Sequence, residues 1–400
     1  MNKLLNKIQG WVHNGFMGND LQMADYAAGT HTGTTYSGRQ FKVYIAPDSG
    51  VGTINTSTNG GDAFRLDIEG VTLPPFSPNQ EFEMRSGSGR IAEFGSMFSS
   101  SKRTVTEFTL SGRATLQDLP IFMENVLAQA DSTNSFPVAT GYSPANIKNG
   151  DATGGSVFSK TLTVWFIPPT AADTYTLPGC VCTSLTLDAD MGTAGGRYNY
   201  SATFQTGYTP TKGSDNLENA AELSTDVGST NIFLSDQQTK DMNIMDIDSS
   251  GTDHTSINPI LNSVSLSIES PSVFLGAQGT NAEPEVISRA VPELNITFGG
   301  TIKYDTSTDK LIEAFRDPAQ TSYIQFALNN RALDNGLGQP FASNIAIAAS
   351  SDQLFGFIIE KAKLTSCEVS SEDVAMVSFE MKVLDQGTNE TIQIATGATA

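Results

Sequence analysis

One stretch of the sequence occurs twice in altered form, as a strand-like run followed by a short amphipathic helix. Residues 106–129 read TEFTLSGRATLQDLPIFMENVLAQ, and residues 294–315 read LNITFGGTIKYDTSTDKLIEAF. Both pass through a T-[LF]-x-G step, at residues 109–112 and 297–300, and the apolar positions of the two helices correspond. The alternative is coincidence, because β-rich chains share Thr and Gly easily. The shared order of elements predicts one supersecondary unit used twice.

Four further pairs of strand-like segments recur in the same order. They are 66–69 with 266–269, 162–166 with 323–328, 182–187 with 364–369, and 198–204 with 375–381. Apolar and polar residues alternate along most of them, which is typical of strands with one buried face. A chain of 400 residues is also long for a single small core. We therefore predict two tandem β domains.

The predicted division of the chain has five parts. They are an N-terminal arm (1–35), a first β domain (36–210), an acidic linker or interface-wrapping segment (211–259), a second β domain (260–388) and a C-terminal tail (389–400). Apolar residues at helical spacing between Leu4 and Val12 predict a helix in the arm. That helix packs either on its own domain or on a neighbouring subunit. The tail either adds an edge strand or frays.

The charge balance argues against tight binding to nucleic acid. The chain has 23 Lys and Arg against 43 Asp and Glu, a net charge of -20. Most of the acidic excess follows residue 210. Binding to phosphates requires clustered basic residues, and this sequence has the opposite balance. The acidity serves either solubility alone or a surface past which DNA moves without being retained.

Motifs that would indicate catalysis or a bound metal are incomplete. Residues 246–251 resemble the start of a calcium loop, but Ile257 occupies the position that requires a bidentate Glu. Residues 87–92 have the form G-x-G-x-x-A without the expected βαβ context. The three His residues are scattered, and the three Cys residues lack the spacing of a zinc site or a disulfide framework. We predict no catalytic, cofactor or metal site, no enzyme activity, no secretory signal and no membrane-inserted helix.

The strands that precede the two helices each have one polar face. Apolar residues alternate with polar ones, so the helix is expected to cover the apolar face. The polar face is then expected to border solvent or a water-filled channel. These polar residues are Glu107, Thr109, Ser111 and Arg113 in the first strand, and Asn295, Thr297, Thr301 and Lys303 in the second. The open edges of such sheets must be paired or protected, and closing several sheets into a ring does so.

A long connection, residues 73–104, precedes the first strand–helix unit. Loops of this length in a compact domain are usually functional or mobile.

With its two strand–helix units, this connection and the returning strands around Leu185, Phe204, Val369 and Phe379, the chain resembles the tail tube (major tail) proteins of long-tailed bacteriophages. The resemblance covers most of the chain and lies in the pattern and order of segments, without a diagnostic motif. It implies a mainly β fold with short helices, as two tandem tail-tube-like β-sandwich domains, each with one helix packed on a sheet. In that family six domains form a ring, and the sheets join into an inner barrel.

The resemblance also implies an assembly. A duplicated chain would form a homotrimeric, pseudo-hexameric ring, and rings would stack into a tube in the virion after synthesis in the host cytoplasm. The polar strand residues would line the lumen, through which double-stranded DNA passes without specific binding during genome ejection. Other partners would be the tape measure, terminator and baseplate proteins and, where present, a sheath.

In that family the long loop reaches another subunit or ring. Here the residues that would do so are Pro75, Phe76, Arg85, Arg90, Phe94, Met97, Phe98 and Lys102.

Two alternatives remain open. One is another tail component of the same fold, such as a terminator or baseplate ring protein. The other is a β-sandwich binding module or hydrolase unrelated to phage.

Overall fold

The structure is a computed structural model. It describes residues 41–48, 52–54, 64–66, 68, 78–82, 97–103, 105–115, 118–127, 140–142, 161–169, 174–191, 196–208, 210–213, 239–247, 254–257, 261–275, 286–289, 295–306, 308–319, 321–329, 353–371, 374–384 and 392–396. The chain divides into two compact units, residues 1–37 and 38–400. All described residues belong to the second unit, so the predicted N-terminal arm lies outside them.

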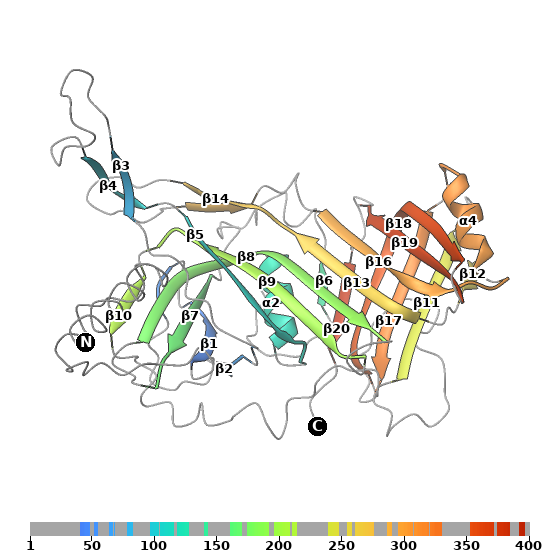
Figure 1. Cartoon of the computed structure of the whole chain (residues 1–400), viewed down its shortest axis with the longest axis horizontal. Helices are drawn as coiled ribbons and strands as arrows, with labels where there is room; N and C mark the ends of the chain where they lie inside the picture. Colours follow the sequence, from blue (N-terminus) through green and yellow to red (C-terminus); the bar gives the residue numbers. More distant parts are fainter. Residues whose placement is uncertain are drawn as a thin grey trace, which may run out of the picture. The chain divides into compact units, whose positions relative to one another are not determined.

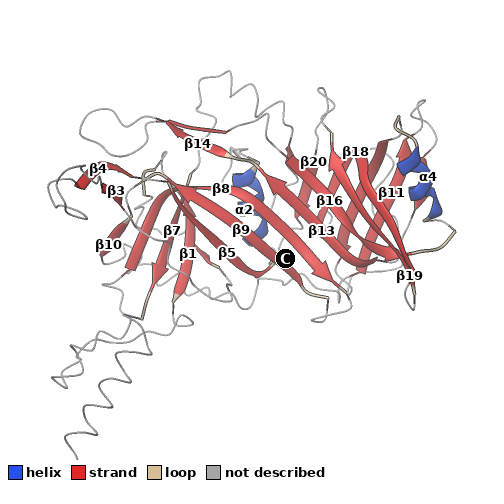
Figure 2. Cartoon of the chain, turned by 45° about the horizontal axis from the view of Figure 1, so that its top comes forward, coloured by secondary structure: helices blue, strands red, loops and turns tan. Residues whose placement is uncertain are grey.

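The described part is mainly antiparallel β sheet with two short helices, as Figures 1 and 2 show. This confirms the predicted mainly β fold with short helices. The helices are α2 (Asp118–Val126) and α4 (Asp309–Arg316). The strands are β1 (Lys42–Pro47), β2 (Phe64–Arg65), β3 (Pro78–Phe82), β4 (Met97–Arg103), β5 (Thr106–Arg113), β6 (Thr140–Tyr142), β7 (Leu162–Ile167), β8 (Thr174–Asp190), β9 (Tyr198–Thr206), β10 (Thr211–Gly213), β11 (Thr239–Ile247), β12 (His254–Ile257), β13 (Leu261–Glu269), β14 (Ser272–Leu275), β15 (Val286–Arg289), β16 (Asn295–Lys303), β17 (Thr321–Asn329), β18 (Gln353–Ser371), β19 (Ala375–Val383) and β20 (Ile392–Thr396).

The largest sheet runs through both predicted domains. Its main path is β12-β11-β17-β18-β19-β16-β13-β8-β7-β1-β2, and β5 joins it through β9. The two halves meet where β13 pairs with β8, from Ser263 opposite Asp190 to Glu269 opposite Ser184. Because the sheet is continuous, residues 38–400 form one compact unit. The division into two domains at the stated boundaries stays a prediction.

The same set of strand pairings occurs twice. In the first half β1 pairs with β7, β7 with β8, β8 with β9, and β9 with β5. In the second half β11 pairs with β17, β17 with β18, β18 with β19, and β19 with β16. The strand–helix units and three of the four further predicted pairs are therefore present as a repeat of pairings. The predicted correspondence of 66–69 with 266–269 is wrong, because residues 64–66 lie beside β1 whereas β13 pairs with β16 and β8.

The repeat extends to the irregularities of the sheet. The pairing of β8 with β9 shifts register between Cys182 and Ser184, and that of β18 with β19 shifts between Leu364 and Ser366. At both shifts one threonine has no register partner on the neighbouring strand, and its hydroxyl donates a hydrogen bond to a backbone carbonyl of that strand. Thr183 donates to Thr203 at 3.3 Å, and Thr365 donates to Glu380 at 3.1 Å. A β-bulge bends its strand and increases the local twist, so both long strands change direction at the same place.

The pairing registers correct one detail of the predicted repeat. Phe204 and Met381 are equivalent, because each directly follows the residue whose carbonyl accepts the bulge hydrogen bond. Phe108 lies opposite Phe204, and Phe298 lies opposite Met381, so Phe108 is equivalent to Phe298. The two T-[LF]-x-G steps are thus offset by two positions, which the sequence alignment did not show. Such an offset keeps every side chain on its face of the sheet, because strands repeat at every second residue.

Aromatic side chains and the apolar face of α2 form much of the buried core. Phe122 of α2 packs against Tyr200 and Phe204 with ring centroids 4.9 and 5.8 Å apart. Asn125 accepts a hydrogen bond from the backbone N–H of Cys182 at 2.6 Å and so ties the helix to β8. The helix begins after a capping interaction in which the Thr115 hydroxyl accepts from the Asp118 N–H at 3.1 Å.

A turn closed by two reciprocal hydrogen bonds directly precedes helix α4. The Thr308 hydroxyl accepts from the Asp305 N–H at 2.8 Å, and the Asp305 carboxylate accepts from the Thr308 N–H at 3.2 Å. Leu311 and Ala314 are buried, and the helix contacts β18. Each half therefore has one helix against its long strand, as predicted.

Three segments outside the strands predicted for the two domains contain strands. Part of the predicted acidic linker forms β11 and β12, and Ile244 of β11 is buried opposite Ile324. The long connection contains the β3–β4 hairpin. In the C-terminal tail β20 pairs with β18 and β6, so the strand alternative is the one observed. β11 and β20 are stabilised by pairing with strands distant in the sequence, whereas β3 and β4 pair with each other.

Replacing Gly300 with Ala should destabilise the sheet. A Cβ atom there would lie 2.3 Å from the Ser263 carbonyl oxygen, which is backbone and cannot rotate away. We expect a loss of about 1–3 kcal/mol in the free energy of unfolding. The control is Gly213→Ala in β10, where a Cβ meets nothing within 4 Å and the change should stay within about 0.5 kcal/mol. Denaturant unfolding of both variants measures this, and equal effects would contradict the close approach.

A buried carboxylate holds the end of β1 to its neighbours. Asp48 accepts hydrogen bonds from the hydroxyls of Thr161 and Thr163 and, at 3.1 Å, from the Gly179 N–H. Burial raises the pKa of Asp48 above 3.8, although these bonds act in the opposite direction. The folded state therefore favours the protonated acid.

This raised pKa predicts a pH dependence. The contribution of Asp48 to stability should be fully present below pH 3.8 and should fall as pH rises through the raised value. Asp48→Asn cannot titrate, so the unfolding free energy of the wild type minus that of the variant should decrease as pH rises above 3.8. Denaturant unfolding of both proteins across this range measures the difference. A difference that grows with pH would mean that hydrogen bonding outweighs burial.

Candidate functional site

The candidate site is a polar face of the main sheet that crosses both halves. We call it the polar face. It consists of the outward-facing residues of β5, β9, the second part of β8, β13, β16, β19 and the second part of β18. Burial alternates along these strands, so apolar residues face the core while the polar residues between them are exposed or half-buried.

The pairing registers align these polar residues into rows across the strands. One row runs Thr109, Thr203, Ser184, Glu269 and Asn295. The next runs Ser111, Ser201, Thr186, Ser267, Thr297 and Lys382. Each row passes from the first half into the second without interruption, because β8 and β13 are paired.

Hydrogen bonds between neighbouring strands fix several side chains of the polar face. The Thr109 and Thr203 hydroxyls lie 3.1 Å apart, and Thr301 and Ser378 lie 3.4 Å apart. Gln205 donates to Glu107 at 2.8 Å. These bonds are exposed, and two of the three join hydroxyl groups, so hydroxyls make up much of what the face presents to water.

The charges on the polar face are mixed. Its acidic residues are Glu107, Asp188, Asp190, Glu269, Glu368 and Glu380, and its basic residues are Arg113, Lys303, Lys363 and Lys382. Partial burial raises the pKa of Asp188. Lys363 lies opposite Lys382, but carboxylates outnumber basic residues among the described residues of the face, so it lacks the larger basic cluster that binds phosphates tightly.

All eight residues predicted to line a channel lie on the polar face. Glu107, Thr109 and Ser111 are exposed, Arg113 is half-buried, and the four residues of β16 are exposed or half-buried. Whether they border a lumen stays a prediction. Of the residues predicted to reach another subunit, Met97, Phe98 and Lys102 lie on β4. Pro75, Phe76, Arg85, Arg90 and Phe94 lie outside the described residues.

Much of the polar face was not predicted from the sequence. The prediction covered only the strands before the helices, whereas β9, β8, β13, β18 and β19 also contribute. The signal was available in Tyr198–Thr206, where tyrosine and phenylalanine alternate with Asn199, Ser201, Thr203 and Gln205. Which strands lie beside one another, however, is not encoded in any single segment.

The described residues contain neither a candidate metal-binding cluster nor a candidate membrane-spanning helix. Within these ranges, no group of three or more His, Cys, Asp or Glu side chains could hold a metal ion. In the same part of the chain, no helix is long and apolar enough to cross a membrane.

Comparisons with known proteins give little further information. No family model matches the sequence, and no curated protein matches it. A solved structure of a mutant form of the Hcp1 protein from E. coli EAEC 042 pathovar is similar over 39% of this chain and 98% of that chain. The identity is 13% and the TM-score is 0.20. At that TM-score the likeness carries no argument about fold or function.

Proposed function

We propose that this chain is a structural protein that assembles with copies of itself into rings, and that the rings stack into a bacteriophage tail tube. Three chains supply six similar halves to each ring. The polar face lines the lumen, and double-stranded DNA passes along it during genome ejection.

The observation that carries this proposal is the repeat of pairings joined into one sheet. Each half contributes the same strands in the same order, and β13 on β8 joins the halves edge to edge. A unit that joins to its copy in this way can join again, and rings form when such head-to-tail contacts close. Closure would also remove exposed sheet edges, which otherwise favour aggregation.

The chemistry of the polar face is consistent with transport of DNA. Hydroxyl groups offer weak, exchangeable hydrogen bonds, and the interspersed carboxylates repel phosphates. Each additional phosphate contact would strengthen binding and slow release. A face on which carboxylates outnumber basic residues therefore favours passage over retention.

The remaining parts of the proposal follow from this role. The protein is not an enzyme and requires no cofactor, and it is located in the virion. Its partners besides itself are the other tail proteins, namely the tape measure, terminator, baseplate and, where present, sheath proteins. The β3–β4 hairpin reaches a neighbouring subunit or ring.

Purified protein tests the assembly directly. Light scattering after size exclusion should give masses that are multiples of three chains, and negative-stain microscopy should show rings or tubes with a central hole. A single closed ring that never stacks would favour a terminator or baseplate ring protein instead. A stable monomer at all concentrations would contradict a structural role.

Lysine substitutions on the polar face test the channel. Replacing Thr109, Ser111, Thr297 and Thr301 with Lys should leave assembly intact but slow the release of DNA. The slowing should weaken at higher salt, because each Lys adds a salt-dependent phosphate contact. The control carries Gln at the same four positions, which adds a long polar side chain without charge. Normal release at low salt would mean that this face does not line the channel.

A further inference from the structure

The second half has one sheet edge whose counterpart in the first half is covered. On β8, residues 184–189 pair with β9 on one side and with β13 on the other. On β18, Ala362 pairs with both β17 and β19, so these two strands lie on opposite sides. After Ala362, β18 pairs with β19 alone among the described residues. The other side of residues 363–371 is the counterpart of the edge that β13 covers.

An apolar side chain, Val369, is exposed at the same edge. Leu187 of β8 is 3% exposed because it lies opposite Leu266 of β13. Its counterpart on β18 is Val369, since each residue occupies the same place after the bulge of its strand. Val369 faces the apolar side of the sheet, opposite Val377, yet it is 45% exposed. The difference is what the absence of a neighbouring strand would produce.

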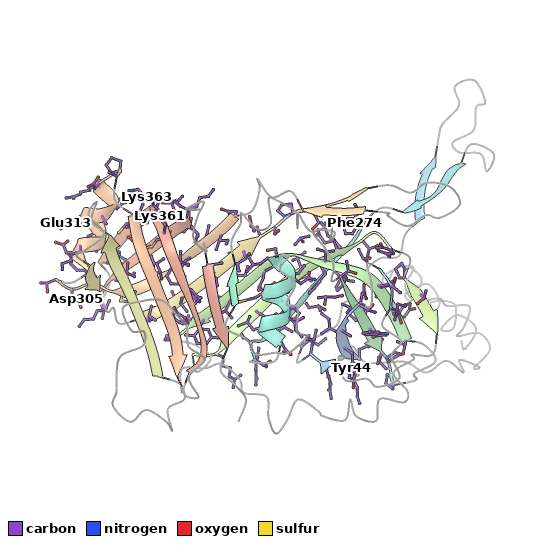
Figure 3. The ribbon with its side chains drawn as sticks, turned by 180° about the vertical axis from the view of Figure 1, so that it is seen from behind. Tyr44, Phe274, Asp305, Glu313, Lys361 and Lys363 are labelled. Atoms are coloured by element: carbon purple, nitrogen blue, oxygen red, sulfur yellow. The ribbon has the colours of Figure 1, made fainter. Side chains whose placement is uncertain are left out.

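Helix α4 also has an exposed apolar side chain at this end of the sheet. The apolar residues of α2 are buried, whereas Phe315 of α4 is 41% exposed. Lys363 donates from its ammonium to the Asp317 carbonyl at 2.5 Å, which places the end of α4 beside the uncovered part of β18. Figure 3 shows Glu313 of α4 and Lys361 and Lys363 of β18 at this end. We call Phe315, Cys367, Val369 and the exposed Val374 the β18 edge patch.

In the first half, β5 lacks a paired strand on one side among the described residues. β16 pairs with β19 on one side and β13 on the other, whereas β5, its counterpart, pairs only with β9 among the described residues. Val105, directly before β5, is 43% exposed. The large apolar side chains exposed in the described part are Val105, Tyr304, Phe315, Val369 and Val374. Phe315, Val369 and Val374 lie in or beside α4, β18 and the β18–β19 connection, and Val105 lies at the start of β5, whereas Tyr304 follows β16.

We infer that the β18 edge patch of one copy docks onto the β5 side of the first half of a second copy. In this contact, β18 of one copy and β5 of the other take the places that β8 and β16 have on either side of β13 within one chain. The two surfaces differ, so the contact is head-to-tail and each copy keeps one free β18 edge and one free β5 side until a ring closes. This inference rests on the proposed self-assembly and names the surfaces that carry it.

Single substitutions test the two surfaces. Val369→Arg or Phe315→Arg should weaken self-association at least about tenfold, because each buries a charge in an apolar contact. Glu313→Arg is the control, since it places the same cation on α4 two residues from Phe315, roughly on the opposite side of the helix. Sedimentation velocity across a concentration series measures the association. Unchanged association of both patch variants, in a protein whose wild type assembles, would overturn the inference but not the proposed function.

A mixing experiment distinguishes head-to-tail docking from contact between like edges. Val105→Arg should also weaken association, because it blocks the β5 side. A Val369→Arg copy and a Val105→Arg copy each keep one intact surface, so their mixture should form a one-to-one dimer that does not grow. Failure to form that dimer, or normal assembly of Val105→Arg alone, would overturn the inference.

The native cysteines provide a test without substitution. Cys180 and Cys182 are fully buried, whereas Cys367 is half-buried within the patch. Alkylation with N-ethylmaleimide, followed by peptide mass spectrometry, should modify Cys367 in the dissociated wild type and at least about tenfold more slowly after assembly. Equal rates would overturn the inference. A wild type that never assembles would instead contradict the proposed function.

Discussion

The pairing of β13 with β8 is the interaction on which the arrangement of the described residues depends. It places Leu266 opposite Leu187 and Ile268 opposite Leu185, so the apolar faces of the two halves form one continuous core. On the opposite side it aligns Ser267 with Thr186, so the polar face is continuous as well. Without this ladder each half would have a sheet edge of unpaired backbone groups and a row of exposed apolar side chains. Among the described residues, no strand pairs with the other side of β18 beyond Ala362, so the same requirement remains unmet there.

The bulges at Thr183 and Thr365 lie where one long strand in each half passes from one set of neighbouring strands to another. Before the bulge, β8 pairs with β7 and β18 pairs with β17. Pairing with β9 and β19 begins a few residues before the bulge and continues beyond it, where both strands contribute to the polar face. A bulge redirects a strand without breaking it, and the threonine hydroxyl bonded to the next strand stabilises the bend. The equivalent position of both bulges supports the proposal that the two halves occupy equivalent places in a ring.

The proposed tube requires a surface that water wets and that phosphates do not bind strongly. Alternation along the strands provides such a surface because nearly every second residue is Ser, Thr, Asn, Gln or an isolated charge. The same alternation places Phe108, Phe204 and Phe298 on the other side of the sheet. There they pack against other aromatic side chains and fill the core. Structure and proposed function thus depend on one periodicity, so a one-residue slip of register would disrupt both.

The sequence by itself determined the mainly β fold, the two short helices, the alternating faces and the repeat, because strand periodicity, capping and the spacing of apolar residues are local. All eight polar residues predicted before the helices lie on one face for that reason. It did not reveal that β11 lies within the acidic segment, because its partner β17 is distant in the sequence and their pairing, not local alternation, stabilises it. It also misaligned β5 with β16 by two positions, since identical Thr and Gly steps do not fix a register. Only the tertiary structure decided which strands are neighbours, and with that which sheet edges are covered and which remain open, because backbone hydrogen bonds between distant segments leave no pattern in either segment alone.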